Sequence, residues 1–430
     1  MTDLKKNVPE LRFPEFEGEW EEKKISDSIK ILKSGLSREL SANDIGLPVI
    51  RANNLQDYRL VLDDVKYWYK EDPQGANTAK YLLEKNDILI NFINSESKMG
   101  TSCILTDDCE RESIYTTNIL RYVTKENFDS YFHFIYTQTY EYRKWIKIIT
   151  KPAVNQASFT TVDFKKIPYH VPEIKEQQKI GDFFSKLDRQ IELEEQKLVL
   201  LEEQKKGYMQ KIFSQELRFK DDNGNDYPEW EEKKLSDLGS YSKSYSFSRD
   251  VEGEGKVHHI HYGDIHSKLP SKISDINLLP TIKESKDFEF LQKGDIIFAD
   301  ASEDYKDLGK AIMVDIDEDN IIAGLHTHVF RPNLQVVSEF LMYYTKTLNY
   351  FKFIKRQGTG ISVLGISKKN LSNFILGLPE YKEQQKIGDF FSKLDQQIEL
   401  QGQKIENLKQ RKRDCSKRCL CNVNIHVCNH

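Results

Sequence analysis

The sequence has no long apolar run. No stretch approaches the ~18 unbroken apolar residues that a membrane helix needs, and residues 1–10 lack the apolar core of a signal peptide. Cysteine is scarce, with six among 430 residues, and four of the six fall within the last sixteen residues, which argues against a disulfide framework along the chain. The net charge of -5 gives no general argument for a polyanionic partner. We expect an intracellular, cytoplasmic protein.

What the chain does have is length and large apolar side chains. At 430 residues it should hold about three compact units. Apolar residues make up 38% of it, and 23 Phe, 21 Tyr and 4 Trp can fill more than one buried core. Disorder along the whole chain is therefore excluded.

Two internal repeats organise the sequence. Residues 172–193 recur as 379–400 with 20 identities in 22 positions, and the shorter segment 19–27 recurs as 229–237 with one change. If the end of the chain is taken to continue into its beginning, both halves have the same order of motifs. The N-terminal segment is therefore expected to pack beside the C-terminal helix and to complete a pseudo-two-fold body.

The longer repeat predicts a helix. Pro172 and Pro379 stand near its first turn, each followed by a Glu where the helix dipole favours negative charge. Apolar residues then recur at spacings of four and three, which is the pattern of a coiled-coil seam, with Glu194 and Lys205 as exceptions. About 40 residues would make a rod of roughly 60 Å, and two such rods should pair antiparallel. The seam positions are Ile180, Phe184, Leu187, Ile191, Leu198, Leu201, Tyr208 and Ile212, then Ile387, Phe391, Leu394, Ile398, Ile405 and Leu408.

Between the repeats lie two segments of similar length whose sequences barely match. Each mixes alternating, strand-like runs with Gly and Asn turns and then a helix, so the predicted fold class is α+β. We expect two α+β heads separated by two long antiparallel coiled-coil helices, in a circular, pseudo-two-fold repeat. The expected division is an N-terminal segment 1–27, a first head 28–171, a helical spacer 172–237, a second head 238–378, a C-terminal helix 379–412 and an atypical tail 413–430.

Three motifs occur in the same order in both halves. They are Pro-Glu-x-x-Glu-Gln-Gln-Lys-Ile at 172–180 and 379–387, the Glu-Trp-Glu-Glu-Lys-Lys segments, and the Asp-Ile-Leu or Asp-Ile-Ile strands that follow Leu83 and Leu291. In this duplicated order the chain resembles the specificity (S) subunit of Type I DNA restriction-modification enzymes, over essentially its whole length to about residue 412.

The resemblance implies a division of labour. Two target-recognition domains would each read one half of a split double-stranded DNA site, while the paired helices set the gap and dock two methyltransferase (M) subunits. Endonuclease/translocase (R) subunits would complete the enzyme. S-adenosylmethionine, ATP and Mg²⁺ would belong to those partners, and this chain would have no catalytic site, no cofactor, no metal and no membrane contact. Two heads about one helical turn (~34 Å) apart could enter successive major grooves, and the adenine to be methylated would be flipped out by the partner.

Candidate base contacts follow an apolar strand in the first head. Arg51, Asn53 and Asn54 come directly after residues 47–50, where Arg can bind guanine and Asn can bind adenine through two hydrogen bonds. The alternative is that the two Asn residues only form a turn.

The corresponding stretch of the second head is rich in histidine. A metal site is disfavoured there, because no Cys is near and alternating His is what one face of a strand shows. Base or phosphate contact is the preferred interpretation. The candidates are His259, His261, Tyr262 and His266.

Each head also offers an aromatic, basic helix followed by a small polar loop, which can approach DNA phosphates closely. The alternative is a solvated charged face over buried aromatics. The first head contributes the candidates Lys144, Lys147, Lys151, Asn155, Gln156 and Ser158. The second contributes Lys352, Lys355, Arg356, Gly358, Thr359 and Gly360.

A catalytic alternative rests on Asp87 with Glu96 and Lys98, and on Asp295 with Asp304 and Lys306. Both sets fit the Asp…(Asp/Glu)-x-Lys pattern of Mg²⁺-dependent nucleases. The short pattern and the loop-like residues between its members disfavour it, and Lys98 is also a candidate DNA contact. A third interpretation is a scaffold that binds only proteins.

The tail departs from the first copy after residue 412. There the seam is expected to lose its apolar residues. Reading the coding sequence two bases along in plausible codons restores the match, so we interpret the last ~18 residues as a frameshifted end whose last turn could fray. The coding DNA tests this. The alternative is a zinc site, whose candidate ligands are Cys415, Cys419, Cys421, Cys428, His426 and His430.

Overall fold

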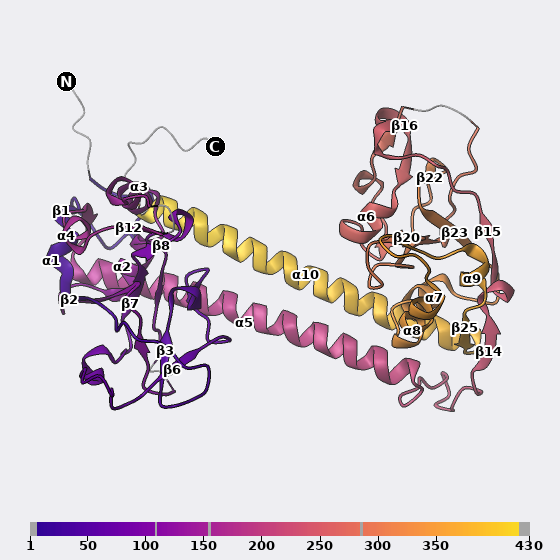
Figure 1. Cartoon of the computed structure of the whole chain (residues 1–430). Coiled ribbons are helices and arrows are strands. Elements are labelled where there is room, and N and C mark those ends of the chain that lie inside the picture. Colours follow the sequence, from indigo (N-terminus) through magenta and orange to yellow (C-terminus); the bar gives the residue numbers. More distant parts are fainter. Residues whose placement is uncertain (1–6, 108–109, 154–155, 284–286, 421–430) are drawn as a thin grey trace, which may run out of the picture. The chain divides into compact units, whose positions relative to one another are not determined.

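The computed structural model describes residues 7–107, 110–153, 156–283 and 287–420 (Figure 1). It divides into two compact units. Unit 1 comprises Met1–Glu195 and Gln403–His430, and unit 2 comprises Gln196–Gly402. In the described ranges, no helix has both the length and the apolar character to cross a membrane.

Unit 1 contains the first head and parts of both long helices. Its strands are β1 (Glu21–Lys24), β2 (Ile29–Ser34), β3 (Leu47–Ile50), β4 (Leu55–Gln56), β5 (Arg59–Leu60), β6 (Lys66–Trp68), β7 (Ile88–Asn91), β8 (Ile93–Asn94), β9 (Ser102–Ile104), β10 (Ile114–Tyr115), β11 (Ile119–Thr124), β12 (Ala157–Ser158) and β13 (Pro168–Val171). Its helices are α1 (Ile25–Ser28), α2 (Ser130–Tyr136), α3 (Tyr140–Ile149), α4 (Thr161–Lys165) and the first part of α5 (Ile174–Phe213).

Unit 2 contains the second head. Its strands are β14 (Glu231–Lys234), β15 (Gly239–Ser242), β16 (Glu252–Ile260), β17 (Lys272–Ile273), β18 (Thr281–Ile282), β19 (Ile296–Ala299), β20 (Ala301–Ser302), β21 (Ala311–Val314), β22 (Ile321–Ala323), β23 (Thr327–Pro332), β24 (Leu364–Gly365) and β25 (Ile375–Leu378). Its helices are α6 (Tyr262–Ser267), α7 (Ser338–Tyr344), α8 (Leu348–Gln357), α9 (Lys368–Ser372), the rest of α5 and the first part of α10 (Tyr381–Leu420).

Both heads are built on the same plan. The first has an antiparallel sheet in the order β2-β11-β7-β9, and its core side chains pack against α2, α3 and α4. The second has the order β15-β23-β19-β21-β17, packed against α7, α8 and α9. Each head adds a small sheet with one parallel pair, β3 with β10 in the first and β16 with β22 in the second. The predicted α+β class is confirmed for both heads.

One repeated turn shows how the shared sequence fixes this plan. Asn86 and Gly294 have φ of 69° and 91°, which Asn and Gly tolerate, just before the central strands β7 and β19. The side chains that follow close the turn, because Asp87 accepts a hydrogen bond from the Glu84 N–H and Asp295 from the Gln292 N–H.

In each unit, the first turn of one long helix is attached to the head by a buried cluster that we call the helix clamp. The helix is α5 in unit 1 and α10 in unit 2. In unit 1 the clamp consists of Arg12, Trp20 and Glu176. The Glu176 carboxylate is 1% exposed, and it accepts hydrogen bonds from Arg12 at 2.7 and 2.8 Å and from the Trp20 indole at 3.4 Å. Gln177 adds a second attachment, since its Oε1 accepts the N–H of Asp129, the residue that caps α2.

The clamp of unit 2 has the same chemistry. Glu383 is fully buried and accepts hydrogen bonds from Arg218 at 2.7 Å and from the Trp230 indole at 3.1 Å. Gln384 accepts the Val337 N–H beside α7. The repeated motifs are therefore identical because each half uses them to hold its head onto its own helix.

Glycine lets the head approach the helix backbone. A Cβ on Gly181 would lie 2.4 Å from Asp129 Oδ1, and a Cβ on Gly388 would lie 2.8 Å from Glu339 Cβ. Gly181 stands in α5 beside the residue that caps α2, and Gly388 stands in α10 beside α7, so a larger residue at either position would require Asp129 or Glu339 to shift.

Within each unit, α5 and α10 run antiparallel, as the seam predicts; Figure 1 draws α5 in magenta and α10 in yellow. In unit 1, Asp188 pairs with Lys412 at 2.7 Å and Glu195 with Lys409 at 2.9 Å. In unit 2, Lys205 pairs with Asp395. Lys205 and Glu194, the polar exceptions in the seam, thus bind oppositely charged residues of the facing helix, because Glu194 pairs with Lys404.

The N-terminal segment packs beside the end of α10. The N–H of Leu11 donates to the Arg418 carbonyl at 2.9 Å, just as the Leu217 N–H donates to the Lys211 carbonyl near the end of α5 in unit 2. The circular order of the motifs is thus matched by contacts that close unit 1.

The expected loss of the seam after residue 412 is wrong for the residues that the structure describes. α10 continues to Leu420, and Cys415, Cys419 and Leu420 join the core of unit 1. The physical reason is that a free Cys packs as a small apolar side chain. Burial raises the pKa of the Cys419 thiol to about 11. The frameshift interpretation stays a prediction, and Cys421, His426, Cys428 and His430 lie outside the described residues.

Candidate nucleic-acid interface

Arg51, Asn53 and Asn54 follow β3, as the sequence predicts, but their side chains have different roles. Asn54 is 2% exposed; its Oδ1 accepts the Arg51 N–H, and its Nδ2 donates to the Val61 carbonyl, which is the turn-forming role. Arg51 is partly exposed, and its Nη2 donates to Asp64 Oδ2 at 2.7 Å. This hydrogen bond lowers the pKa of the Asp64 carboxyl. A guanidinium fixed in this way presents its remaining donors in one orientation.

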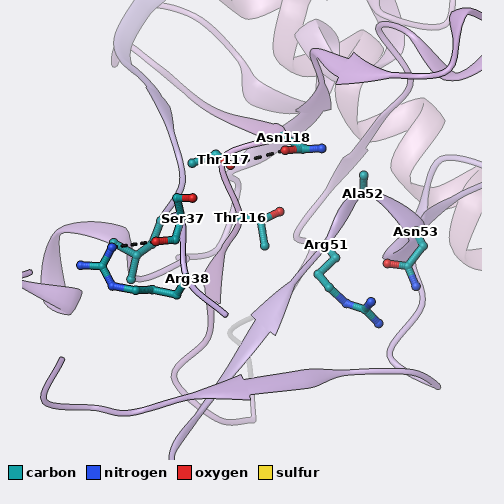
Figure 2. A pocket seen from close by; sticks show the side chains of 9 residues that line it. Ser37, Arg38, Arg51, Ala52, Asn53, Thr116, Thr117 and Asn118 are labelled. Carbon is teal, nitrogen blue, oxygen red and sulfur yellow. Dashed lines mark hydrogen bonds between the residues drawn. The ribbon is translucent and has the colours of Figure 1, made fainter. Parts of the chain in front are cut away.

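Arg51 and Asn53, but not Asn54, line an open hollow of about 320 Å³ in the first head. Figure 2 shows Arg51 and Asn53 on one side, Ser37 and Arg38 on the opposite side, and residues 116–118 between them. Seven of the nine lining residues are polar, the exceptions being Leu36 and Ala52, so the hollow offers hydrogen-bond donors and acceptors of the kind that read base edges.

Arg38 holds the wall of the hollow in place. Its Nε and Nη2 both donate to Asp72 Oδ2, at 3.0 and 2.5 Å, and its Nη1 donates to the Ser37 carbonyl. The bond from Arg38 lowers the pKa of the Asp72 carboxyl to about 2. Since these bonds occupy the guanidinium, Arg38 positions the loop that carries Ser37.

The histidines of the second head divide between core and surface. His259 is fully buried, with its Nε2 3.2 Å from Glu252, and His261 is 7% exposed and caps α6 by accepting the Gly263 N–H. Neither side chain lies open at the surface. Tyr262 and His266 are partly exposed, and their rings pack edge to face at 5.5 Å.

Burial lowers the pKa of both His261 and His266, and the charge of Arg249 lowers that of His261 further. The lowered pKa of each imidazole favours its neutral form near pH 7, which offers a hydrogen-bond donor and an acceptor and no charge. Among the described residues, no group of three or more His, Cys, Asp and Glu side chains is arranged to hold a metal ion.

The predicted phosphate contacts on α3 and α8 are exposed cations. Lys144 and Lys147 lie on the outer face of α3, while its buried face is formed by Tyr142 and Ile146. On α8 the buried residues include Tyr350 and Ile354, and Lys352, Lys355 and Arg356 are exposed. Within the described ranges, none of these five cations forms an ion pair with an acidic side chain, so their charge is available to a phosphate.

The loops after these helices occupy equivalent places. Lys151 and Ser158 bridge the base of the first loop, and Thr359 and Gly365 bridge the base of the second. Gly358 caps α8, and Gly360 has φ of 128°, a conformation that favours glycine. Gln156 is exposed, whereas Asn155 lies outside the described residues. The bridge at the base of each loop thus lies close in sequence to the helix that carries the cations.

In both heads, the first carboxylate of the nuclease pattern is buried in an ion pair and is not available to a metal ion. Asp87 is 1% exposed and lies 2.6 Å from Arg121 Nε, and Asp295, equally buried, lies 2.8 Å from Arg331. These ion pairs join the turn before β7 or β19 to the neighbouring strand, which is a structural role. Glu96 and Lys98 stand in an exposed 3-10 turn, where Lys98 remains a predicted DNA contact.

The sequence did not single out Ser37, Arg38, residues 116–118 or His326. His326 is exposed, its ring packs edge to face on Tyr262 at 5.2 Å, and its Nδ1 lies 3.2 Å from Asp300 Oδ1. These residues come from segments far apart in the chain, so no local motif marks them. Residues 116–118 and His326 stand just before β11 and β23, and this position was the available signal for them.

A family model described as Type I restriction modification DNA specificity domain matches residues 17–203 and 227–410. The candidate specificity subunit of the MjaX type I restriction enzyme of Methanocaldococcus jannaschii is 25% identical over 424 residues, which is 95% of this chain and 94% of that protein. The specificity subunit of the HindI type I restriction enzyme of Haemophilus influenzae is 31% identical over 188 residues, 42% of this chain and 39% of that protein.

Among solved structures, the S subunit of a Type-I restriction-modification system from M. genitalium is similar in fold. The TM-score is 0.61 at 15% sequence identity, and the likeness covers 97% of this chain and 100% of that one. At this identity the likeness shows the fold alone.

Proposed function

Because this chain belongs to the family of Type I restriction modification DNA specificity domains, we propose that it is the DNA-reading subunit of a Type I restriction-modification complex. Its two recognition domains read the two halves of a bipartite double-stranded target. Its helices dock two methyltransferase subunits, and endonuclease/translocase subunits complete the complex in the cytoplasm.

The observation that supports this proposal is that the two heads are attached to their helices by the same residue types but carry different residues at corresponding places. The helix clamps of the two units use the same three residue types, whereas the residues after β3 and β16 are Arg51 to Asn53 in one head and His261 to Gly263 in the other. Different donors and acceptors at the same place suit the reading of two different half-sites. The exposed cations of α3 and α8 suit phosphate contacts that set the register of each head.

The chemistry of methylation and cleavage then belongs to the partners. This chain binds bases and phosphates, while S-adenosylmethionine, ATP and Mg²⁺ act in the methyltransferase and endonuclease subunits. The ion pairs of Asp87 and Asp295 with arginine side chains support this division, because neither carboxylate is open to a metal ion.

The test is to co-express the full chain with candidate methyltransferase subunits and to map methylated adenines by sequencing. We expect a split motif with a fixed number of unread base pairs, and no methylation when this chain is omitted. A continuous motif would contradict the bipartite proposal. Mg²⁺-dependent cutting of DNA by the chain alone would favour the nuclease, and a complex without salt-dependent DNA affinity would favour the scaffold.

A further inference from the structure

The backbone arrangement that frames the hollow of the first head is repeated in the second head. In the first head, the Leu36 N–H donates to the Tyr115 carbonyl and the Thr116 N–H donates to the Ile50 carbonyl. These bonds bring together the segments 36–38, 51–53 and 116–118, which line the hollow.

The second head repeats both bonds. The Tyr245 N–H donates to the Ala323 carbonyl at 2.9 Å, and the Gly324 N–H donates to the Ile260 carbonyl at 2.9 Å. The strand pairing agrees, because β3 pairs in parallel with β10 as β16 does with β22. Segments 245–247, 261–263 and 324–326 are therefore the equivalents of the three lining segments.

The residues at these nine pairs of positions have diverged almost completely. Only Ser37 and Ser246 are of the same type. The first head offers guanidinium, amide and hydroxyl groups beside one leucine, whereas the second offers the aromatic rings of two Tyr and one Phe, two imidazoles and one leucine. The surrounding framework has kept its hydrogen bonds, so folding alone does not account for the divergence of the lining.

One pair of equivalent positions stands just before β11 in the first head and β23 in the second. The Asn118 carbonyl accepts the Phe92 N–H, and the His326 carbonyl accepts the Asp300 N–H, so the two residues occupy the same place before β11 and β23. Asn118 lines the hollow between the two other segments (Figure 2).

His326 adopts a backbone conformation that is uncommon for residues other than glycine. Its φ is 56°, in the left-handed region, and yet its side chain is 48% exposed. Tyr262 and Asp300 contact the ring and fix its orientation. Backbone strain at an exposed, oriented side chain is typical of binding sites, where the position of the side chain matters more than its cost.

We propose that the three segments form the base-reading site of each head, and that Asn118 and His326 are specificity-determining residues that contact base edges of the two half-sites. The proposal rests on the proposed function. The amide of Asn118 suits adenine, and the imidazole of His326 suits a base edge that offers a hydrogen-bond acceptor or donor.

The experiment uses the full chain, co-expressed with its methyltransferase subunits, and maps methylated adenines across a genome. The variants are Asn118→Ala and His326→Asn, because Asn tolerates a positive φ and so preserves the backbone of the second head. The control is Asn223→Ala, an exposed residue in the turn after α5. If His326→Asn does not assemble, His326→Gly removes the imidazole while keeping the conformation.

Each variant should lose about tenfold of its preference at one base pair of one half-site, and the two variants should affect different halves. The other half, the gap and the control should be unchanged. Variants that methylate the original motif with unaltered preference would overturn this inference and leave the proposed function standing. An unmodified complex that methylates no split motif would overturn both.

Discussion

At the residue scale, the two exposed cations in the last turn of α8 carry a prediction about salt. Lys355 and Arg356 have no ion-pair partner within the described ranges, and a cation that contacts a phosphate releases counterions on binding. Replacing either by Ala should lower the DNA affinity of the assembled complex equally for all sequences. It should also reduce the slope of log affinity against log salt by about 1.

Titration of binding over a range of salt concentrations measures this slope. Lys85→Ala, which removes an exposed cation from the turn before β7, is the matched control and should leave it unchanged. A change in the methylated motif, with an unaltered salt slope, would show that Lys355 or Arg356 reads bases.

A second prediction at this scale concerns acid stability. His133 in α2 is 2% exposed, with Nδ1 2.7 Å from the Asp129 carbonyl and Nε2 2.9 Å from the Tyr169 hydroxyl, and burial lowers its pKa from 6.5 to about 4. Between these values the unfolded chain binds a proton that the folded chain does not. The free energy of unfolding should thus fall by about 3 kcal/mol as the pH drops from 6.5 to 4.

Thermal unfolding across this pH range measures the effect. His133→Gln removes the titrating group, so its stability should fall less with acid, even though the variant is less stable at pH 7. His170→Gln in β13, where the side chain is 28% exposed, is the control and should keep the pH dependence of the unmodified protein.

At the element scale, the helix clamp is the feature whose loss should matter most. Removing Arg12 leaves the buried Glu176 carboxylate without its partner, and breaking such a pair costs about 3–5 kcal/mol. Arg12→Ala should therefore lower the free energy of unfolding of unit 1 by about this amount. Arg189→Ala, which breaks an exposed pair with Glu192 on the same helix, should change it by less than about 1 kcal/mol.

Denaturant unfolding measures the free energy of unfolding of the Arg12 and Arg189 variants. Hydrogen exchange then shows whether the stability was lost in unit 1 or in unit 2. Equal stability of the Arg12 and Arg189 variants would show that the clamp is not what holds the first head to α5.

At this scale the sequence predicted long regular elements well and short ones poorly. The seam of α5 and α10 follows from the repeating apolar positions, since helix packing depends on a local period. Strands of two residues such as β8 and β20 were taken for loops, because their pairing with β12 and β24 depends on residues about 60 positions away. The same limit hid residues 116–118.

At the scale of the whole molecule, both long helices run from one unit into the other. If they set the gap in the target, inserting one heptad after Glu195 in α5 and one after Gly402 in α10 adds about 10 Å and keeps the seam in phase. The preferred target should then contain about three more unread base pairs.

Mapping the methylated motif of the co-expressed complex measures the gap. A seven-residue insertion in the turn at Asn223 is the control, because it lengthens the chain outside both helices. An unchanged gap in the double insertion would show that the helices do not set the spacing.

The sequence by itself determined the duplicated plan, the two long helices and the family, because repeats and helical periods are local patterns that survive in the order of residues. It also proposed DNA contacts at Arg51 and Tyr262, which are partly exposed, and at the cations of α3 and α8, which are exposed; their contact with DNA stays a prediction. Only the tertiary structure decided that Asn54 and His259 are buried, that Asp87 binds Arg121, and that Asn118 and His326 occupy equivalent sites. Burial and side-chain partners arise where distant segments meet, and the sequence of any one segment does not contain that information.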